Sequence, residues 1–540
     1  MRDFSSGNAV KQILLFSIPM LIGSIFQQLY SMVDAMVVGR YVGGNALAAV
    51  GVAMNVLQFL LAVVIGLTSG ASVIISQLYG AGQYDKVRRM TSTSIIFLTG
   101  LTLLIAIPGI VFAPALFKAL NAPPEILDEA VLYMRVLIGG VLFPIFYNMY
   151  TAYLRALGDS RSPLFILICC TVLNVGLDLL FVVAFKLGVA GAAIATIIAQ
   201  SVSAGLCYLY VRRSVAYLHV RKLEFDVGLF RSILKYGVPT AVQLSFVSLA
   251  QLTITRLINS FGAAAIAGIT ASSKIDSMAT MPVSTVSMAM STFVAQNMGA
   301  GQEERARKGF RSALLIMLSL AICTSALIIA FGPWLISMFL NPNDLNSDTI
   351  LRIGINYMNI MVVFYFLFAF LFAFNGFFRG AGDAVIAMAF PVASLTLRTV
   401  SAYLLVHLAG FGPEALAWSI PVGWVTCSFA SWIYYRKRLW AGKAITAQEP
   451  RDAQETQEAQ EPRDAQEAPV TLETQEAQEE TATQAEKEAP EETAAQAAQD
   501  EPVTLETQAA QDEPAAQESH AAHESLESLT VQESHVIQDP

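Results

Sequence analysis

Three side chains that can carry or bind charge stand inside long apolar stretches of this 540-residue chain. Asp34 lies in QQLYSMVDAMVV, and Asn174 and Asp178 lie in CCTVLNVGLDLLFVV. Asn174 and Asp178 are four residues apart, a spacing that puts both on one face of a helix. Two buried carboxylates close together would share a proton or bind a cation, because both cannot ionise cheaply side by side. The chemistry that these residues predict is the uptake of a proton or a cation.

Other polar residues in apolar stretches have more than one interpretation. A charge at the middle of a membrane span costs roughly 2.5–3.5 kcal/mol on translocon scales, so each one needs a reason. Lys274 and Asp276 lie in ASSKIDSM, two positions apart, and therefore do not face each other on a helix. They either line a central cavity, where Asp276 would attract cationic substrates, or neutralise neighbouring groups. Thr196 supplies a hydroxyl group that can donate or accept a hydrogen bond.

Pro19 is a candidate hinge, because it precedes Asp34 by 15 residues in the same apolar stretch. A proline inside a helix removes a backbone donor and allows a kink. Neutralisation of Asp34 by a proton or cation could then bend this helix toward a cavity and displace a substrate.

Enzyme chemistry is not indicated by the sequence. The chain contains no G-x-x-x-x-G-K-[ST], so we expect no ATP hydrolysis. His219 and His407, the histidines before the last hundred residues, stand alone, and no C-x-x-C pair is present. We therefore predict no catalytic residue, no cofactor and no structural metal, apart from Na⁺ as a possible transported ion at Asp34, Asn174 and Asp178.

The elements that must position these residues are membrane-spanning helices. Of all residues, 55% are hydrophobic and only 14% are charged, which is unusual for a soluble protein of this length. Continuous apolar stretches of about 20 residues or more predict helices that cross a bilayer, since a barrel would alternate with period two. The twelve predicted spans are 13–38, 46–77, 93–117, 131–155, 162–185, 188–211, 233–260, 264–295, 312–340, 352–378, 385–407 and 412–435.

Lysine and arginine in the connections predict the orientation of these spans. Sixteen of them lie in the connections that we assign to the cytoplasm, and three to five lie in the opposite connections. We expect a multi-pass protein of the plasma (inner) membrane with both termini in the cytoplasm. The first apolar stretch is expected to be retained as a helix, because no signal-peptide cleavage pattern follows it.

Residues 441–540 differ in composition from the rest of the chain. They contain 25 acidic and only 4 basic residues, and they repeat the phrases EPRDAQE and PVTLETQ. Such a segment cannot bury enough apolar area to offset chain entropy, so we predict a disordered, low-complexity tail. A repeat expansion without a role in transport is favoured over a regulatory tail.

Internal similarity indicates a duplication. Gln77-Leu-Tyr-Gly-Ala-Gly-Gln matches Gln296-Asn-Met-Gly-Ala-Gly-Gln, and Arg155-Ala-Leu-Gly-Asp matches Arg379-Gly-Ala-Gly-Asp. The predicted fold is all-α and integral to the membrane, with twelve transmembrane helices in two six-helix bundles related by pseudo-twofold symmetry. The predicted domains are an N-terminal lobe (1–210), a cytoplasmic interlobe loop (211–232), a C-terminal lobe (233–440) and the tail (441–540). A cleft between two bundles favours transport by alternating access, and the glycines of the repeated turns are interpreted as tight corners.

These repeated segments, together with the opening PMLIGSIFQQLYSMVDAMVVGR, resemble the multidrug and toxic compound extrusion (MATE) transporters of bacteria over about residues 10–440. In the DinF-like branch of that family, an Asp in span one, an Asn and an Asp in span five and a Thr in span six form a cation site. The resemblance places those roles on Asp34, Asn174, Asp178 and Thr196, with Tyr133 as a weaker addition. The corresponding positions of the second repeat, Thr253 or Ile254, Arg398 and Ala402, do not preserve this chemistry. The Glu in span seven of the NorM-like branch is also missing.

The resemblance implies an antiporter, coupled to H⁺ or Na⁺, that exports amphipathic and often cationic organic compounds, including drugs. The alternative is a flippase for lipid-linked saccharides from the same wider superfamily, which would favour a cationic central cavity and would not need Asp34. The expected partners are small-molecule substrates, the coupling ion and the lipid bilayer, without nucleic acid, and the protein is expected to be a monomer. The sequence does not choose between H⁺ and Na⁺.

Overall fold

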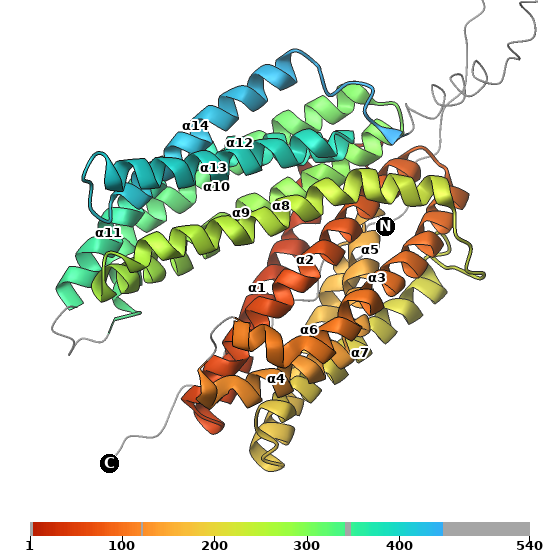
Figure 1. The fold of residues 1–540 in the computed structure, drawn as a ribbon. Helices are drawn as coiled ribbons and strands as arrows, with labels where there is room; N and C mark the ends of the chain where they lie inside the picture. Colours follow the sequence, from red (N-terminus) through yellow and green to blue (C-terminus); the bar gives the residue numbers. More distant parts are fainter. Residues whose placement is uncertain (1–3, 120–122, 341–346, 446–540) are drawn as a thin grey trace, which may run out of the picture. The chain divides into compact units, whose positions relative to one another are not determined.

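The protein is described by a computed structural model that covers residues 4–119, 123–340 and 347–445, all within the first of two units of the chain, Met1–Glu461. The described part consists of helices joined by short connections (Figure 1). Of the predicted tail, residues 446–540 lie outside the described residues. Residues 441–445 are described, and Ala444 and Ile445 are buried.

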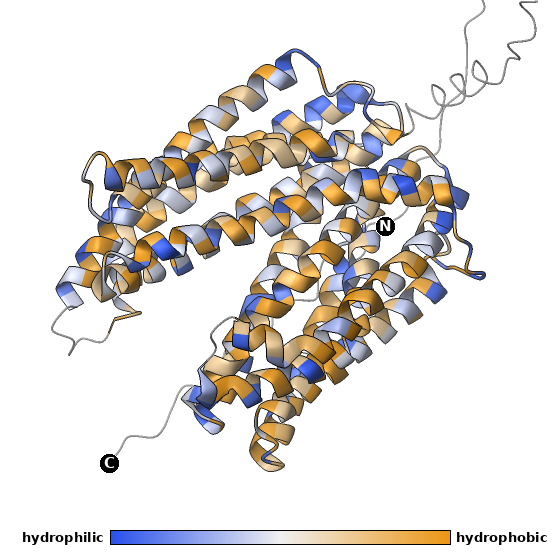
Figure 2. Ribbon diagram, viewed as in Figure 1, coloured by the Kyte–Doolittle hydropathy of each residue, from blue (hydrophilic) through white to orange (hydrophobic). Residues whose placement is uncertain are grey.

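The helices follow the predicted spans closely. Among the described residues, ten helices are long and apolar enough to cross a membrane, and two bent pairs raise the number of candidate spans to twelve. Figure 2 shows hydrophobic residues along most of each helix and hydrophilic residues gathered near the ends and connections. The elements are α1 (Ala9–Tyr41), α2 (Gly44–Gly80), α3 (Tyr84–Ala119), α4 (Pro124–Gly139), α5 (Leu142–Ala156), α6 (Arg161–Asp178), η1 (Leu179–Ala184), α7 (Gly188–Ser214), α8 (Val227–Asn259), α9 (Ala263–Gly299), α10 (Glu303–Ser337), α11 (Ser347–Val363), α12 (Tyr365–Ala381), α13 (Ala384–His407) and α14 (Ala415–Arg436).

The fourth and tenth spans are not the continuous helices that the sequence predicted. Each consists of two helices, α4 with α5 and α11 with α12, bent by 54° at a short break. In the first pair the break follows Gly139 and Gly140, which weaken a helix. A Cβ on Gly140 would collide with Ile197 of α7, so this corner is also a point of close packing. In the second pair Phe364 separates the helices.

A second departure from regular helix lies beside a predicted site residue. The fifth span is α-helical up to Asp178 and continues as the π-helix η1, so the whole element ends at Ala184, close to the predicted end of the span. Single π-turns inside α-helices are rare and occur frequently at functional sites.

Buried apolar residues form two clusters, and α1 and α8 each contribute to both. Ile13 and Phe16 near the start of α1 pack in the cluster of the C-terminal half, whereas Val38 near its end packs in the cluster of the N-terminal half. In α8 the arrangement is reversed: Ile233 near its start packs in the cluster of the N-terminal half, and Leu257 near its end packs in the cluster of the C-terminal half. The first part of α1 therefore packs with the C-terminal half, and the first part of α8 packs with the N-terminal half. The division of the sequence into lobes at 1–210 and 233–440 stays a prediction.

Candidate functional site

The three polar residues of the first and fifth spans come together in the N-terminal half. Asp34 lies on α1, about two turns before the helix ends, and Asn174 and Asp178 lie on α6, which packs against α1. Their exposed fractions are 6%, 1% and 0%. Asp34 and Asp178 are close enough for their charges to interact. Both α6 residues are buried, which agrees with their placement on one face of the helix.

Most polar atoms of this cluster lack a hydrogen-bond partner within the described part of the chain. These atoms are Oδ1 of Asp34, both carboxylate oxygens of Asp178, Oδ1 and Nδ2 of Asn174 and the hydroxyl oxygen of Tyr133. Buried polar groups are normally paired, and an unpaired one costs free energy. The group presents oxygen atoms, which are the ligands that hard cations prefer, and carboxylates that can take up protons. The cluster can therefore bind a proton or a small cation.

Two tyrosines complete the cluster. Tyr133 of α4 has no exposed surface and interacts electrostatically with Asp34 and Asp178. Tyr30 lies one turn before Asp34 on α1, and its hydroxyl is 3.5 Å from Oγ1 of Thr196 on α7. Tyr30 also interacts with both carboxylates, which connects Thr196 to the cluster. The sequence analysis missed Tyr30, although its i, i+4 spacing from Asp34 was a usable signal.

The C-terminal half treats its own intramembrane acid differently. Asp276 of α9 accepts a hydrogen bond of 2.7 Å from the hydroxyl of Tyr365 and interacts with the guanidinium of Arg398 on α13. Arg398 is the residue that the internal repeat aligns with Asn174. Lys274, by contrast, is exposed. Protein groups thus compensate the charge of Asp276, whereas no described group does so for Asp178.

Two cavities lie beside the predicted hinge. The first, of about 230 Å³, is lined by Pro19 and by residues of α1, α5, α6 and α9. The second, of about 170 Å³, lies between helices of the two halves, and both cavities include Met20, Asn148 and Arg155 in their lining. The lining of neither cavity includes Lys274 or Asp276. Pro19 is therefore next to space for a ligand, while the role of Lys274 and Asp276 in a central cavity stays a prediction.

The repeated glycine-rich segments do more than form corners. Gly82 and Gly301 have φ angles of +73° and +71°, which fits the predicted tight turns. Gly80 and Gly299 make a direct approach between α2 and α9, because a Cβ on either one would collide with the backbone of Gln296 or Gln77.

The two repeated glutamines join the halves of the molecule at the same place. The side-chain amide of Gln77 donates to the carbonyl oxygen of Gly380 at 2.9 Å, and that of Gln296 donates to the carbonyl oxygen of Ala156 at 2.8 Å. The side-chain oxygen of Gln77 also accepts a hydrogen bond from the backbone of Ile445 at 2.9 Å. This end of the space between the halves is therefore closed by a symmetric set of bonds.

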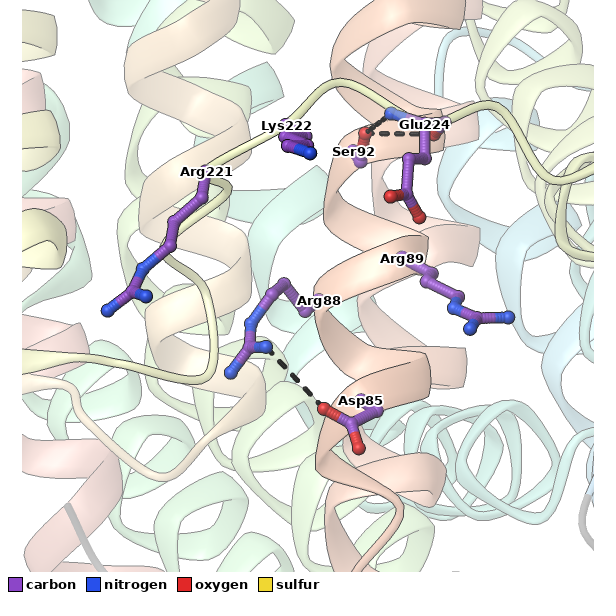
Figure 3. A pocket seen from close by; sticks show the side chains of 7 residues that line it. All are labelled: Asp85, Arg88, Arg89, Ser92, Arg221, Lys222 and Glu224. Carbon is purple, nitrogen blue, oxygen red and sulfur yellow. Dashed lines mark hydrogen bonds and ion pairs between the residues drawn. The ribbon is translucent and has the colours of Figure 1, made fainter.

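A further cavity, of about 370 Å³, lies at the start of α3 and is lined by residues of mixed charge (Figure 3). Arg88 pairs with Asp85 at 3.5 Å, and Ser92 exchanges hydrogen bonds with the backbone of Glu224. Figure 3 shows Arg221 and Lys222 on the connection that follows α7. The lining of this cavity includes none of Asp34, Asn174 and Asp178.

Comparison with known proteins gives a consistent result. Residues 19–180 and 239–404 match the family model described as MatE. The probable multidrug resistance protein YpnP of Bacillus subtilis is 28% identical over 449 residues, covering 83% of this chain and 99% of the relative. The probable multidrug resistance protein NorM of Thermotoga maritima is 26% identical over 447 residues, covering 81% of this chain and 95% of the relative. A crystal structure of MATE in the bent conformation has a TM-score of 0.75 and 25% identity, covering 82% of this chain and 98% of the other.

Proposed function

Because this chain belongs to the MATE family of transporters and is not an enzyme, we propose that it is a multidrug efflux protein that exchanges H⁺ or Na⁺ for amphipathic, often cationic, organic compounds. The observation that supports coupling most directly is the cluster of Asp34, Asn174 and Asp178, whose buried oxygens have no described partner. The names of the relatives, which refer to multidrug resistance, support the export of drugs.

The proposed mechanism links the ion to the substrate through α1. A cation or proton entering the cluster neutralises Asp34, which removes the cost of its buried charge. The helix can respond at Pro19, because a proline lacks the N–H group of a regular helical bond. Pro19 lines the cavity of about 230 Å³, so a change of bend there alters the space available to a substrate. The chemistry and the hinge then share one helix.

Several finer features belong to the same proposal. The cluster, completed by Thr196 and Tyr133, supports assignment to the DinF-like branch. The distribution of lysine and arginine supports a plasma-membrane protein with both termini in the cytoplasm. The protein acts as a monomer in this proposal, with the coupling ion bound in the N-terminal half and none bound around Asp276.

The test is substrate efflux from proteoliposomes with a proton gradient and a sodium gradient imposed separately. Asp34→Asn resembles the protonated side chain permanently, so we expect a folded variant that loses gradient-driven efflux by at least about a hundredfold, as for an interaction of about 3 kcal/mol. Thr253→Val, at the corresponding position of the other half, should keep efflux within about twofold of wild type, because the proposal places no coupling ion in that half. Full gradient-dependent efflux by Asp34→Asn would refute the coupling mechanism while leaving the family intact.

One observation favours the second candidate, a flippase for lipid-linked saccharides. Two arginines, Arg155 and Arg379, line the cavity of about 170 Å³, and no acidic residue lines it. A phosphate of a lipid-linked substrate would suit such a cavity. Vesicles without any lipid-linked saccharide distinguish the two functions. Drug efflux that persists in them supports the exporter and contradicts the flippase.

A further inference from the structure

The two arginines of the repeated R-x-x-G-D and R-G-A-G-D segments meet at one cavity, although 224 positions separate them in the sequence. Arg155 lies near the end of α5 and Arg379 near the end of α12, and both line the cavity of about 170 Å³ between the halves. Arg155 also lines the neighbouring cavity beside Pro19. The duplication has therefore placed a matched pair of guanidinium groups at the shared boundary of the two repeats.

Neither guanidinium has an acidic partner in the described part of the chain. The described ion pairs join other residues, namely Arg88 with Asp85, Lys308 with Glu304 and Arg438 with Glu303. Arg379 donates to Oδ1 of Asn375 at 3.1 Å, but its Nε is buried without a partner. The nearby acids Asp159 and Asp383 are engaged elsewhere, by the hydroxyl groups of Tyr210 and Tyr434.

An uncompensated charge in a membrane protein is costly and marks a functional position. An arginine is always charged, so loss of a proton does not relieve this cost. The rest of the lining consists of serine, threonine, asparagine, methionine and small apolar residues, which provide hydrogen-bonding groups and no negative charge. The lining therefore supplies positive charge and hydrogen-bonding groups, which is the chemistry that binds an anion.

We propose that Arg155 and Arg379 form a binding site for an anionic group of the transported molecule, a carboxylate, sulfonate or phosphate. This inference rests on the proposed transport function and refines its substrate class, from compounds that are often cationic to amphipathic compounds that carry a negative group. Arginine suits this role because its planar guanidinium binds two oxygens of such a group at once. The apolar part of the substrate fits the methionine-containing wall formed by Met20 and Met288.

The position of the site connects binding to the contact between the halves. The carbonyl oxygen of Ala156, the residue after Arg155, accepts the hydrogen bond from Gln296. The carbonyl oxygen of Gly380, the residue after Arg379, accepts the one from Gln77. An anion held by both arginines is thus one residue away from both bonds that close this end of the cavity.

The experiment measures equilibrium binding to the purified full-length protein by fluorescence polarisation, without any gradient. The probes are two xanthene dyes, carboxyfluorescein as the anion and tetramethylrhodamine ethyl ester as the cation. Arg155→Gln with Arg379→Gln should weaken carboxyfluorescein binding about tenfold or more, because two charge-assisted bonds are lost. Arg155→Lys with Arg379→Lys keeps both charges but loses the paired bonds, so its affinity should lie between those of wild type and the glutamine variant. Arg212→Gln with Arg213→Gln removes the same charge from the exposed end of α7 and should change nothing.

Competitors distinguish the two sources of an anionic group. Displacement of the dye by farnesyl phosphate but not by inorganic phosphate would support a lipid-borne phosphate, whereas displacement by neither would support a free organic anion. If wild type bound only the cationic dye, or if the glutamine variant bound carboxyfluorescein normally, the anion site would be wrong. The coupling mechanism is tested separately. It would be wrong if Asp34→Asn kept gradient-driven efflux, and that result would not change the binding of the dye measured without a gradient.

Discussion

At the level of single residues, the two halves of the protein differ in how they treat an acid inside the membrane. Asp276 accepts a hydrogen bond from the hydroxyl group of Tyr365 and interacts with the positive charge of Arg398, so protein groups compensate part of its charge. Asp34 and Asp178 interact with each other and with tyrosines, none of which supplies a positive charge. A site that must take up and release an ion needs this incomplete compensation, because a permanent cationic partner would compete with the ion.

Tyr30 should set the affinity of the coupling site. The hydroxyl group of Tyr30 hydrogen-bonds with Oγ1 of Thr196. Tyr30→Phe removes this hydrogen bond, which contributes about 0.5–1.5 kcal/mol. We expect the ion concentration for half-maximal efflux to rise about threefold to tenfold, with an unchanged maximal rate. Efflux measured against pH and against sodium concentration gives both parameters. Tyr41→Phe is the matched control on α1, since Tyr41 is 53% exposed; an equal effect of both changes would contradict this role.

The acidic residues could be found from the sequence because charges are conspicuous in apolar stretches. Tyr30 could not be found as easily, because a tyrosine in a membrane helix usually packs or anchors at an interface. Arg155 and Arg379 were visible as a repeat, but only the structure shows that they share a cavity. Residue type thus predicts the candidates, and the fold decides which of them meet.

At the level of elements, α1 carries three functions along its length. Its first part packs in the C-terminal cluster, Pro19 lines a cavity, and its last part carries Asp34 and packs in the N-terminal cluster through Val37 and Val38. A change of bend at Pro19 therefore moves two halves of one helix that are packed against different halves of the protein. Hydropathy predicted the ends of this helix to within four residues, because apolar length is a local property. The crossing from one cluster to the other depends on distant side chains and was not predictable.

Replacement of Pro19 should separate stability from transport. Pro19→Ala restores a helical N–H group and removes a residue that costs about 3 kcal/mol inside a helix, so the melting temperature should not fall. Efflux should fall at least about fivefold, since the helix loses its preferred point of bending. Thermal unfolding and efflux measured on one preparation check both statements. Pro239→Ala, at a similar place in α8, is the matched control and should leave gradient-driven efflux within about twofold. Wild-type efflux by Pro19→Ala would contradict the hinge.

The breaks in the fourth and tenth spans show where hydropathy stops being informative. A window of about 20 apolar residues averages over Gly139 and Gly140 and over Phe364, so both spans looked continuous. The π-turn after Asp178 was hidden for the same reason, since its sequence LLFVVA is as apolar as its surroundings. At the first break Gly140 also approaches Ile197 of α7, a contact that the sequence of one span does not contain.

At the level of the whole molecule, the duplicated segments hold the two halves together at one end of the space between them. Gln77 and Gln296 each bond to the opposite half, and Gly80 and Gly299 allow α2 and α9 to touch. In the proposed transport cycle, alternating access requires this contact to separate at one stage. The absence of a side chain at these glycines is therefore a condition for closing the contact, in addition to the corners formed by Gly82 and Gly301.

Gly80→Ala should hold this end of the molecule open. The added methyl group would overlap the carbonyl oxygen of Gln296, and backbone atoms on both sides leave it no flexible neighbour to displace. The reporter is Ser76→Cys in a protein without its native cysteines, because Ser76 is only 1% exposed. We expect this cysteine to react with a thiol reagent at least about tenfold faster when Gly80→Ala is present than when it is absent. Efflux should fall at the same time, because the closed state becomes unfavourable.

Gly51→Ala is the matched control on α2, since a Cβ there meets nothing within 4 Å. Gly299→Ala makes the same collision from the other half and should reproduce the effect. Labelling of Gly80→Ala at the rate of the Gly51→Ala control would show that contact between these helices does not keep this end closed.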